Sequence, residues 1–262
     1  IVEDNPFYGL KNNVFSTKNI CEEALSSSIK KVILISSDKA VRPTNIMGAS
    51  KRIAELIIQG CAKEVEENSD HTKANTKFAM VRFGNVLNSS GSVIPLFKNQ
   101  IAKGGPVTIT DPKVIRYFMT INEAAQLVLQ ASTMAVGGDV FLLDMGEPVS
   151  IVKLAKQMIR LSGFTIKDKK NPNGDIEIVN IGLRPGEKLF EELLINADAQ
   201  LTKHPLIFKA NESYINKKQL WKSLDEIYEL INSEIDENLR AIKLEKVLRK
   251  IVPEWKGKIK IN

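Results

Sequence analysis

The residues best suited to chemistry stand together at the end of an apolar segment. Residues 30–37 form a run rich in β-branched side chains, which is typical of a buried parallel strand. Four polar residues close or follow this run: Ser36, Ser37, Asp38 and Lys39. In doubly wound folds the ligand crevice lies outside the carboxyl ends of the strands, so neighbouring groups of opposite charge can serve there as acid and base. A solvated turn is the alternative interpretation of Asp38 and Lys39.

Met47 and Lys51 continue this segment. They stand four residues apart in a stretch rich in Ala, Leu, Ile, Lys and Glu, which predicts a helix over residues 47–67. Side chains with this spacing share one helix face, so Lys51 can reach back over the edge of the sheet. Taken alone, Lys51 is more typical of a surface lysine.

A second polar segment follows the next predicted strand, residues 77–83. Small and polar residues fill positions 84–92, and a helix is predicted from Val93. Main-chain N–H groups and short hydroxyls beside a helix N-terminus suit phosphate or sugar oxygens. On spacing alone, a Ser/Gly-rich surface loop is the simpler interpretation.

Two arginines complete the candidate set. Arg116 lies among apolar residues, and a buried arginine requires an anion, which can be a structural carboxylate or a ligand phosphate. Arg184 precedes Pro-Gly and, with Glu187, opens a predicted helix. Arginine can fork onto a diphosphate. Glu187 can accept hydrogen bonds from ribose hydroxyls or cap the helix.

Alternating helices and strands must position these residues. Helices are predicted over residues 5–26, 47–67, 93–103 and 122–132, the last with Asn122 as its N-cap, and strands over residues 30–37, 77–83 and 140–144. Ser150 is expected to cap a further helix, and the tail from Asn216 is expected to be helical. This alternation predicts an α/β fold with a parallel sheet and helices on both faces.

Composition excludes several classes of protein. Lysine and arginine exceed aspartate and glutamate by 37 to 31, an excess that suits an anionic ligand but is too diffuse for nucleic acid. No apolar run approaches the roughly 20 residues of a membrane-spanning helix. Cys21 and Cys61 are expected to be buried or half-buried thiols in helices, and His71 and His204 to lie on the surface. No zinc-type cluster is present.

The glycine-rich turn of a dinucleotide-binding fold is missing. Such a fold needs this turn after its first strand, and neither Gly104-Gly105 nor Gly137-Gly138 has the right context. We therefore expect the chain to begin partway through its first domain, to bind NAD weakly or not at all by itself, and to leave room for a membrane anchor in a longer protein.

Residues 35–51 closely resemble the active-site stretch of the nucleotide-sugar 4,6-dehydratases of polysaccharide biosynthesis, which are extended short-chain dehydrogenase/reductases acting mostly on UDP-N-acetylglucosamine. The resemblance rests on Ser37-Asp38-Lys39-Ala40, Arg42 to Asn45, and Met47-Gly48-Ala49-Ser50-Lys51. It extends from Ile1 to about Ile195. Most of the superfamily has tyrosine where Met47 stands, and a thioether cannot accept a proton as that phenol does. Methionine at this position resembles the large, often membrane-anchored dehydratases.

The resemblance implies a Rossmann-type doubly wound sheet, incomplete because its first βαβ half is missing, with a smaller C-terminal α/β substrate-binding domain. We expect residues 1–86, rejoined by 113–145, to form the NAD-binding domain. Residues 87–112 and 146–262 should form the sugar-binding domain and a helical tail. The implied location is the cytoplasm, or the cytoplasmic face of the inner membrane in a longer protein. The implied pathway is capsule, O-antigen or protein-glycan synthesis.

The resemblance also implies site residues, a cofactor and partners. The cofactor is NAD rather than NADP, the substrate is a UDP-sugar, and the enzyme is expected to be a homo-oligomer. Cofactor contacts are expected from Ser36, Lys51, Phe83, Gly84 and Asn85. Substrate contacts are expected from Asn85, Ser90, Gly91, Ser92, Val93, Arg116, Arg184 and Glu187.

In the implied reaction, hydride leaves C4 of the sugar for NAD, water is eliminated across C5 and C6, and the hydride returns to C6. We assign Lys39 as the C5 base and Asp38 as the acid for the C6 hydroxyl. Lys51 should hold the nicotinamide ribose, and Ser37 should hydrogen-bond the C4 oxygen. With Met47 in place, the C4 hydroxyl proton is expected to leave through Ser37 to Asp38 or water.

Two other functions compete with this hypothesis. A nucleotide-sugar 4-epimerase or 4-keto reductase on the same scaffold needs no elimination acid and base and usually keeps the tyrosine, so Asp38, Lys39 and Met47 argue against it. A non-catalytic nucleotide-sugar-binding module is favoured by the missing glycine turn and by Met47. The intact Asp-Lys and Arg-Pro-Gly-Glu segments count against that module.

Overall fold

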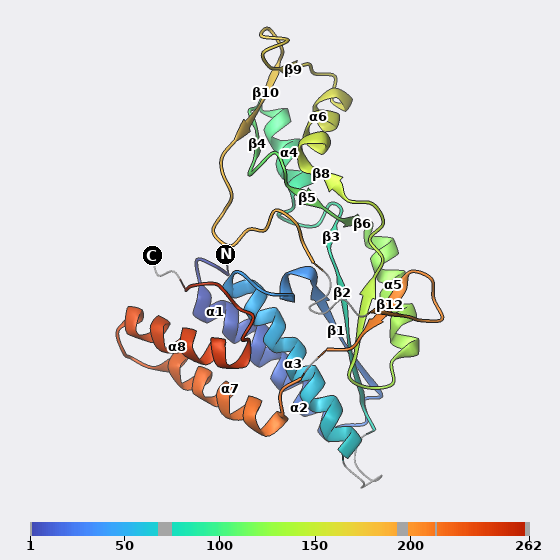
Figure 1. The fold of residues 1–262 in the computed structure, drawn as a ribbon, viewed down its shortest axis with the longest axis vertical. Coiled ribbons are helices and arrows are strands. Elements are labelled where there is room, and N and C mark those ends of the chain that lie inside the picture. The colour runs from blue at the N-terminus through green and yellow to red at the C-terminus, as the bar shows by residue number, and fades with distance from the viewer. Residues whose placement is uncertain (1, 68–74, 193–198, 213, 260–262) are drawn as a thin grey trace. The chain divides into compact units, whose positions relative to one another are not determined.

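The computed structural model describes residues 2–67, 75–192, 199–212 and 214–259 (Figure 1). The chain divides into two compact units. Unit 1 comprises Ile1–Phe83, Gln126–Asp144 and Glu192–Asn262, and unit 2 comprises Gly84–Ala125 and Met145–Glu191. Each unit has its own apolar core.

A five-stranded sheet forms the centre of unit 1. Its strands are β1 (Lys31–Ser37), β2 (Lys77–Phe83), β7 (Asp139–Leu143), β12 (Ile207–Ala210) and β11 (Ala199–Leu201), in that spatial order. The first three run parallel, and β12 and β11 are antiparallel. The predicted α/β fold with a Rossmann-like parallel sheet is confirmed, whereas the hairpin of β12 and β11 was not predicted.

Helices before and after β1 cover one face of this sheet. They are α1 (Pro6–Leu10), η1 (Lys11–Phe15), α2 (Ser16–Ser26) and α3 (Ile46–Glu67). Proline suits the first turn of α1 because an N–H there has no partner within the helix. The predicted helix over residues 5–26 is confirmed, although η1 is a π-helical turn within it. Residues 126–134 of α5 (Ile121–Met134) lie on the other side of the sheet (Figure 1).

The C-terminal tail packs into the core of unit 1. It forms α7 (Lys217–Asn232) and α8 (Glu237–Ile251), which bury Leu220, Leu224, Leu244 and Leu248 in the cluster that contains α3. The tail is helical as predicted. The division into units nevertheless differs from the predicted domains, because residues 192–262 cluster with the first unit rather than with the second. The apolar faces of α7 and α8 pack in the same core cluster as α3.

Unit 2 is built from short strands and two helices. Strands β4 (Val107–Ile109), β10 (Ile176–Asn180) and β9 (Ile166–Lys167) form one sheet. The remaining strands pair as β3 (Asn85–Val86) with β6 (Phe118–Met119), and β5 (Ile115–Arg116) with β8 (Val149–Ser150). Helices α4 (Val93–Ala102) and α6 (Ile151–Leu161) supply Phe97, Ile101, Ile151 and Ile159 to its core. Ser150 caps α6 as predicted, by accepting a hydrogen bond from the Lys153 N–H.

The start of α5 corrects one prediction. Asn122 lies inside the helix and does not cap it. Thr120 and Glu123 form a capping box instead: the Glu123 N–H donates to Thr120 Oγ1 at 3.1 Å, and the Thr120 N–H donates to Glu123 at 2.8 Å. Donation to the Glu123 carboxylate from the Thr120 hydroxyl, at 2.7 Å, and from the Thr120 N–H lowers the pKa of Glu123.

The cysteines and histidines carry no site in the described residues. Cys21 and Cys61 are both buried free thiols, as predicted. Hydrogen bonding to Cys61, together with burial, raises the pKa of the Cys21 thiol. His204 is half-buried, and His71 lies outside the described residues. Among the residues that the structure describes, no group of three His, Cys, Asp or Glu side chains could hold a metal ion. In the same part of the chain, every helix is too short or too polar to cross a membrane.

Candidate active site

The carboxyl end of β1 carries a hydrogen-bonded trio. Lys39 Nζ lies 2.8 Å from Asp38 Oδ1, and Ser37 Oγ donates to the same oxygen at 2.7 Å. The Asp38 side chain is only 3% exposed, whereas that of Lys39 is 30% exposed. A solvated turn is therefore wrong for Asp38. The structure brings together the three residues to which acid, base and hydroxyl roles were assigned.

The main chain fixes this trio. Residues Asp38–Ala40 form the single 3₁₀ turn η2, and Ser37 caps it by accepting a hydrogen bond from the Lys39 N–H. Ala40 and Val41, completely buried, anchor the end of the turn. Gly48 of α3 lies directly against this turn, because a Cβ on Gly48 would be 2.3 Å from the Lys39 carbonyl oxygen. Only glycine fits this approach between the helix and the turn.

Helix α3 presents Met47 and Lys51 together. Between residues 46 and 62 these two keep partial exposure while all the others are buried. The predicted shared face is thus the open face of the helix. The Met47 N–H donates to Glu3 Oε1 at 2.9 Å, and the Gly48 N–H donates to Asn45 Oδ1 at 2.8 Å. The side chains of Glu3 and Asn45 thus accept hydrogen bonds from N–H groups at the helix N-terminus, which have no partner within the helix. The role of Glu3 was not predicted.

A buried ionic cluster lies behind the ends of β1 and β2, and sequence reasoning missed it. Glu55 is its hub: it bonds Arg82 through two contacts of 2.6 Å, Arg52 at 3.0 Å and the Ser36 hydroxyl at 2.6 Å. Glu212, from the segment before α7, bonds Arg82 at 2.5 and 2.7 Å and Arg52 at 3.1 Å. The cluster therefore connects both strand ends to α3 and to the C-terminal tail.

The charge state of this cluster follows from its contacts. Burial alone would raise the pKa of Glu55, but the nearby Arg82 and Arg52 and the Ser36 bond lower it overall. Glu55 is thus an ion despite complete burial. One signal in the sequence could have revealed the cluster: Arg82 interrupts the apolar run of residues 78–83, and a buried arginine requires a carboxylate.

The cofactor and substrate residues predicted at the end of β2 divide between the units. Phe83 ends β2 in unit 1, and Gly84 begins unit 2. Ser36 is buried with its hydroxyl on Glu55. The Asn85 side chain donates to the Tyr117 carbonyl at 3.1 Å.

Ser92 stands at the N-terminus of α4. Its hydroxyl is buried, makes no cap bond and has no hydrogen-bond partner among the described residues. Ser90, Gly91 and Val93 surround it in the chain. An unpaired buried hydroxyl at a helix N-terminus is the kind of group that a ligand oxygen completes.

Arg116 is held by its own chain. Its guanidinium donates to the carbonyls of Ile115 and Lys188, each at 2.8 Å, and lies 3.3 Å from the Glu187 carboxylate. A structural anion therefore occupies it in this structure. Its predicted contact with a ligand stays a prediction.

Arg184 and Glu187 form a turn rather than a helix. The Glu187 N–H donates to the Arg184 carbonyl at 2.9 Å, and the Glu187 carboxylate accepts from the Arg184 N–H at 3.1 Å. The predicted helix is wrong for residues 183–192, because Gly186 adopts a left-handed φ of 72° and turns the chain. Arg184 is exposed.

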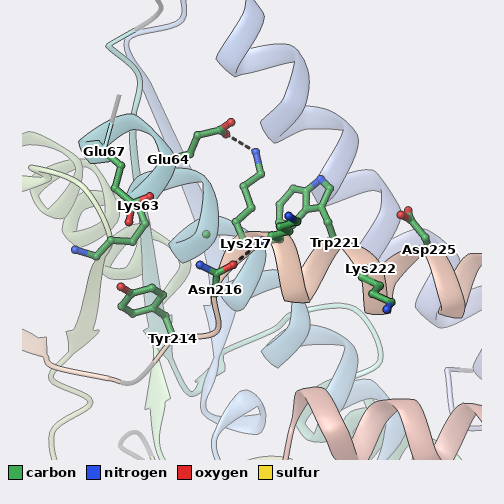
Figure 2. A pocket seen from close by; sticks show the side chains of 11 residues that line it. Lys63, Glu64, Glu67, Tyr214, Asn216, Lys217, Trp221, Lys222 and Asp225 are labelled. Atoms are coloured by element: carbon green, nitrogen blue, oxygen red, sulfur yellow. Dashed lines mark hydrogen bonds and ion pairs between the residues drawn. The ribbon is translucent and has the colours of Figure 1, made fainter. Parts of the chain in front are cut away.

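A separate cavity of about 570 Å³ lies between α3 and the start of α7 (Figure 2). Two of its lysines are engaged within the wall: Lys217 forms an ion pair with Glu64 and lies 4.6 Å from the centre of the Trp221 ring, and Lys63 lies 5.5 Å from the centre of the Tyr214 ring. None of the predicted site residues lines it. The cavity is thus distinct from the residues described above.

Comparison with known proteins places these residues in a sequence context. Residues 1–212 match the family described as "Polysaccharide biosynthesis protein". The capsular polysaccharide biosynthesis protein CapD of Staphylococcus aureus is 57% identical over 194 residues, which are 74% of this chain and 30% of that protein. A UDP-glucose 4-epimerase of Rickettsia rickettsii is 35% identical over 189 residues, 72% of this chain and 50% of that protein. The chain thus spans between 30% and 50% of the length of these two relatives.

Solved structures give the same fold. Pen from Bacillus thuringiensis has a TM-score of 0.66 and 35% identity, covering 85% of this chain and 70% of that chain. The dTDP-glucose 4,6-dehydratase DesIV from Streptomyces venezuelae, solved with NAD and TYD bound, has a TM-score of 0.56 and 13% identity. That match covers 94% of this chain and 68% of that chain and shows likeness of fold alone.

Proposed function

The chain belongs to the polysaccharide biosynthesis protein family, and from this premise we propose that it carries the catalytic acid and base of a nucleotide-sugar 4,6-dehydratase. The proposed substrate is a UDP-N-acetylhexosamine, UDP-N-acetylglucosamine first among them. The observation that carries the proposal is the buried Asp38 carboxylate joined to the partly exposed Lys39 ammonium at the end of a parallel strand.

The pair suits elimination because it can exchange one proton internally. At 2.8 Å, transfer of a proton from Lys39 Nζ to Asp38 Oδ1 converts the ion pair into a neutral amine and a carboxylic acid. The amine then removes the C5 proton while the acid protonates the departing C6 hydroxyl, and water leaves. The ammonium and the carboxylate are thereby restored. When hydride returns to C6, C5 takes up one proton, which balances the proton released by the C4 hydroxyl on oxidation, so the site gains and loses no net proton over one turnover.

Ser37 and Lys51 supply the supporting contacts in this proposal. The Ser37 hydroxyl already bonds Asp38 and can also reach a C4 oxygen, which gives the C4 hydroxyl proton a route that does not use Met47. The partly exposed Lys51 fits a cofactor ribose at the strand ends. NAD, when bound, supplies the hydride acceptor at C4 and the hydride donor at C6.

Unit 2 is proposed to hold the nucleotide sugar. Ser92 offers an unpaired hydroxyl at a helix N-terminus, and Arg184 offers an exposed guanidinium. Both suit the oxygens of a diphosphate. Arg116 is better placed to hold the segment of residues 187–189 that follows Arg184, since its guanidinium already bonds that segment.

A 4-epimerase is the second candidate, because a relative with 35% identity carries that name. An epimerase returns hydride to C4 and needs no acid for a C6 hydroxyl. The buried Asp38–Lys39 pair therefore favours elimination.

The complete gene product incubated with UDP-N-acetylglucosamine and NAD decides between the two. Mass spectrometry that finds a product lighter by one water supports the dehydratase. An isobaric C4 epimer would reject it.

A further inference from the structure

A short C-terminal strap, residues 252–259, follows α8 and is fixed to it. Trp255 is 1% exposed and lies in the core of unit 1. The Arg249 guanidinium lies 4.9 Å from the Trp255 ring centre and donates to the carbonyls of Trp255 and Gly257, at 3.1 and 2.8 Å. The Ile259 N–H donates to Glu245 at 2.7 Å. The strap is therefore bonded to α8 through Arg249 and Glu245.

The strap contacts the segment that joins η2 to α3. The Lys256 N–H donates to the Pro43 carbonyl at 3.2 Å. A Cβ added to Gly257 would lie 2.9 Å from the Thr44 carbonyl oxygen and 2.4 Å from Trp255 Nε1, so the strap approaches Thr44 without room for a side chain. Glu254 meets Arg52 Nε at 3.2 Å on α3.

The segment that the strap contacts adjoins Asp38 and Lys39, the proposed acid and base. Residues 41–45 run from the turn that carries Lys39 to the helix that carries Met47 and Lys51. A Cβ on Gly48 would lie 2.3 Å from the Lys39 carbonyl oxygen and 2.9 Å from Pro43. The turn η2, residues 41–45 and helix α3 are therefore in close contact, with no room for a side chain at Gly48. Arg52 also bonds Glu55, which holds Ser36. We therefore expect a shift of Pro43 or Thr44 to displace the Lys39 backbone.

We infer that the strap is a positioning element of the active site, in which Gly257 acts through Thr44 and Glu254 acts through Arg52. The strap lies beyond residue 212, where the match to the family ends. Its effect on catalysis rests on the proposed function. Its effect on the mobility of residues 38–48 does not.

The test uses Gly257→Ala in the complete gene product, with Gly60→Ala as the matched control. Gly60 also faces the tail, but a Cβ there meets its nearest neighbour, the Trp221 ring, at an ordinary 3.5 Å. Amide hydrogen exchange is measured by mass spectrometry alongside kcat and KM for UDP-N-acetylglucosamine. We expect Gly257→Ala to speed exchange in residues 38–48 and to lower kcat about tenfold with little change in KM, because small displacements of reacting groups cost rate rather than binding. Gly60→Ala should match the wild type in both.

A second pair keeps the inference testable if Gly257→Ala does not fold. Glu254→Ala removes the partner of Arg52 Nε while Glu55 and Glu212 still bond Arg52. It should speed exchange in residues 38–48 and lower kcat, and Glu254→Gln, whose amide oxygen can still accept, should restore both. Wild-type exchange in residues 38–48 of folded Gly257→Ala, or of Glu254→Ala, overturns the inference. If the wild type releases no dehydrated sugar while exchange responds as expected, the proposed function fails and the strap remains coupled to the segment.

Discussion

Lys39 Nζ and Asp38 Oδ1 lie 2.8 Å apart, and the two side chains differ sharply in their access to solvent. The carboxylate is almost completely enclosed, while the amine keeps part of its surface open. In the proposed site a ligand therefore has freer access to the amine than to the carboxylate, and the two groups exchange a proton across their direct contact. Proton transfer between them needs no diffusing water.

Replacing Lys39 with Ala should stop proton removal at C5. General-base catalysis contributes about 10²- to 10⁴-fold, so deuterium incorporation at C5 from heavy water should slow by at least 100-fold. Mass spectrometry of recovered sugar measures the incorporation. Lys30→Ala, an exposed lysine just before β1, is the control and should exchange like the wild type. Undiminished incorporation in Lys39→Ala would exclude Lys39 as the base.

Replacing Asp38 with Asn should stop both C5 exchange and elimination. Asparagine keeps a carbonyl oxygen for the Ser37 hydroxyl but cannot deliver a proton to the C6 oxygen. Lys39 also loses the group that accepts its proton, so we expect the dehydrated product and C5 deuterium incorporation both to fall by about 100-fold or more. C5 deuterium incorporation that persists in Asp38→Asn would show that Lys39 loses its proton without Asp38.

Replacing Glu55 with Gln should destabilise unit 1. The change leaves Arg82 and Arg52 buried with one carboxylate fewer, and breaking such a buried pair costs about 3–5 kcal/mol in the free energy of unfolding. Urea denaturation followed by circular dichroism measures the loss. Glu66→Gln breaks only an exposed pair with Lys63 and should leave the urea midpoint unchanged. Equal midpoints for both variants would contradict the role given to the cluster.

Glu55 should also make the stability of unit 1 depend on pH. The folded-state pKa of Glu55 lies below its ordinary value of 4.5, so the unfolded chain binds more protons in this range than the folded one. Stability from Glu55 is therefore complete above 4.5 and is lost as the pH falls through the lower, folded-state pKa. Urea midpoints between pH 6 and 3 should fall less steeply for Glu55→Gln than for the wild type. Parallel curves would assign the acid sensitivity to other carboxylates.

Removing the Ser92 hydroxyl should weaken substrate binding alone. A neutral hydrogen bond contributes about 0.5–1.5 kcal/mol, so Ser92→Ala should raise KM for the UDP-sugar by roughly 2- to 12-fold at unchanged kcat. Steady-state kinetics measures both constants. Ser162→Ala, after the end of α6 in the same unit, is the control. Unchanged KM and kcat in Ser92→Ala would place this hydroxyl outside the binding site.

The sequence by itself determined the features that depend on near neighbours. Alternating helix and strand patterns located β1, β2, β7 and α3 within a residue or two, because hydrophobic period and length are local properties. Asp38 and Lys39 are adjacent in the chain, so their meeting at a strand end needed no long-range information. The spacing of four between Met47 and Lys51 fixed their common helix face in the same way.

Only the tertiary structure decided which distant groups meet. Glu55 and Arg82 are 27 residues apart, and Arg82 and Glu212 are 130 apart, so no local pattern could pair them. The Arg116 guanidinium pairs with the carboxylate of Glu187, and the tail helices pack in the core of unit 1 with α3 rather than with the second unit. Turn geometry at Gly186 and a capping box at Thr120 overrode the helix boundaries that composition favoured. A buried charge or an apolar helix face in the sequence implies that a partner exists. Only the folded chain shows which residue or surface that partner is.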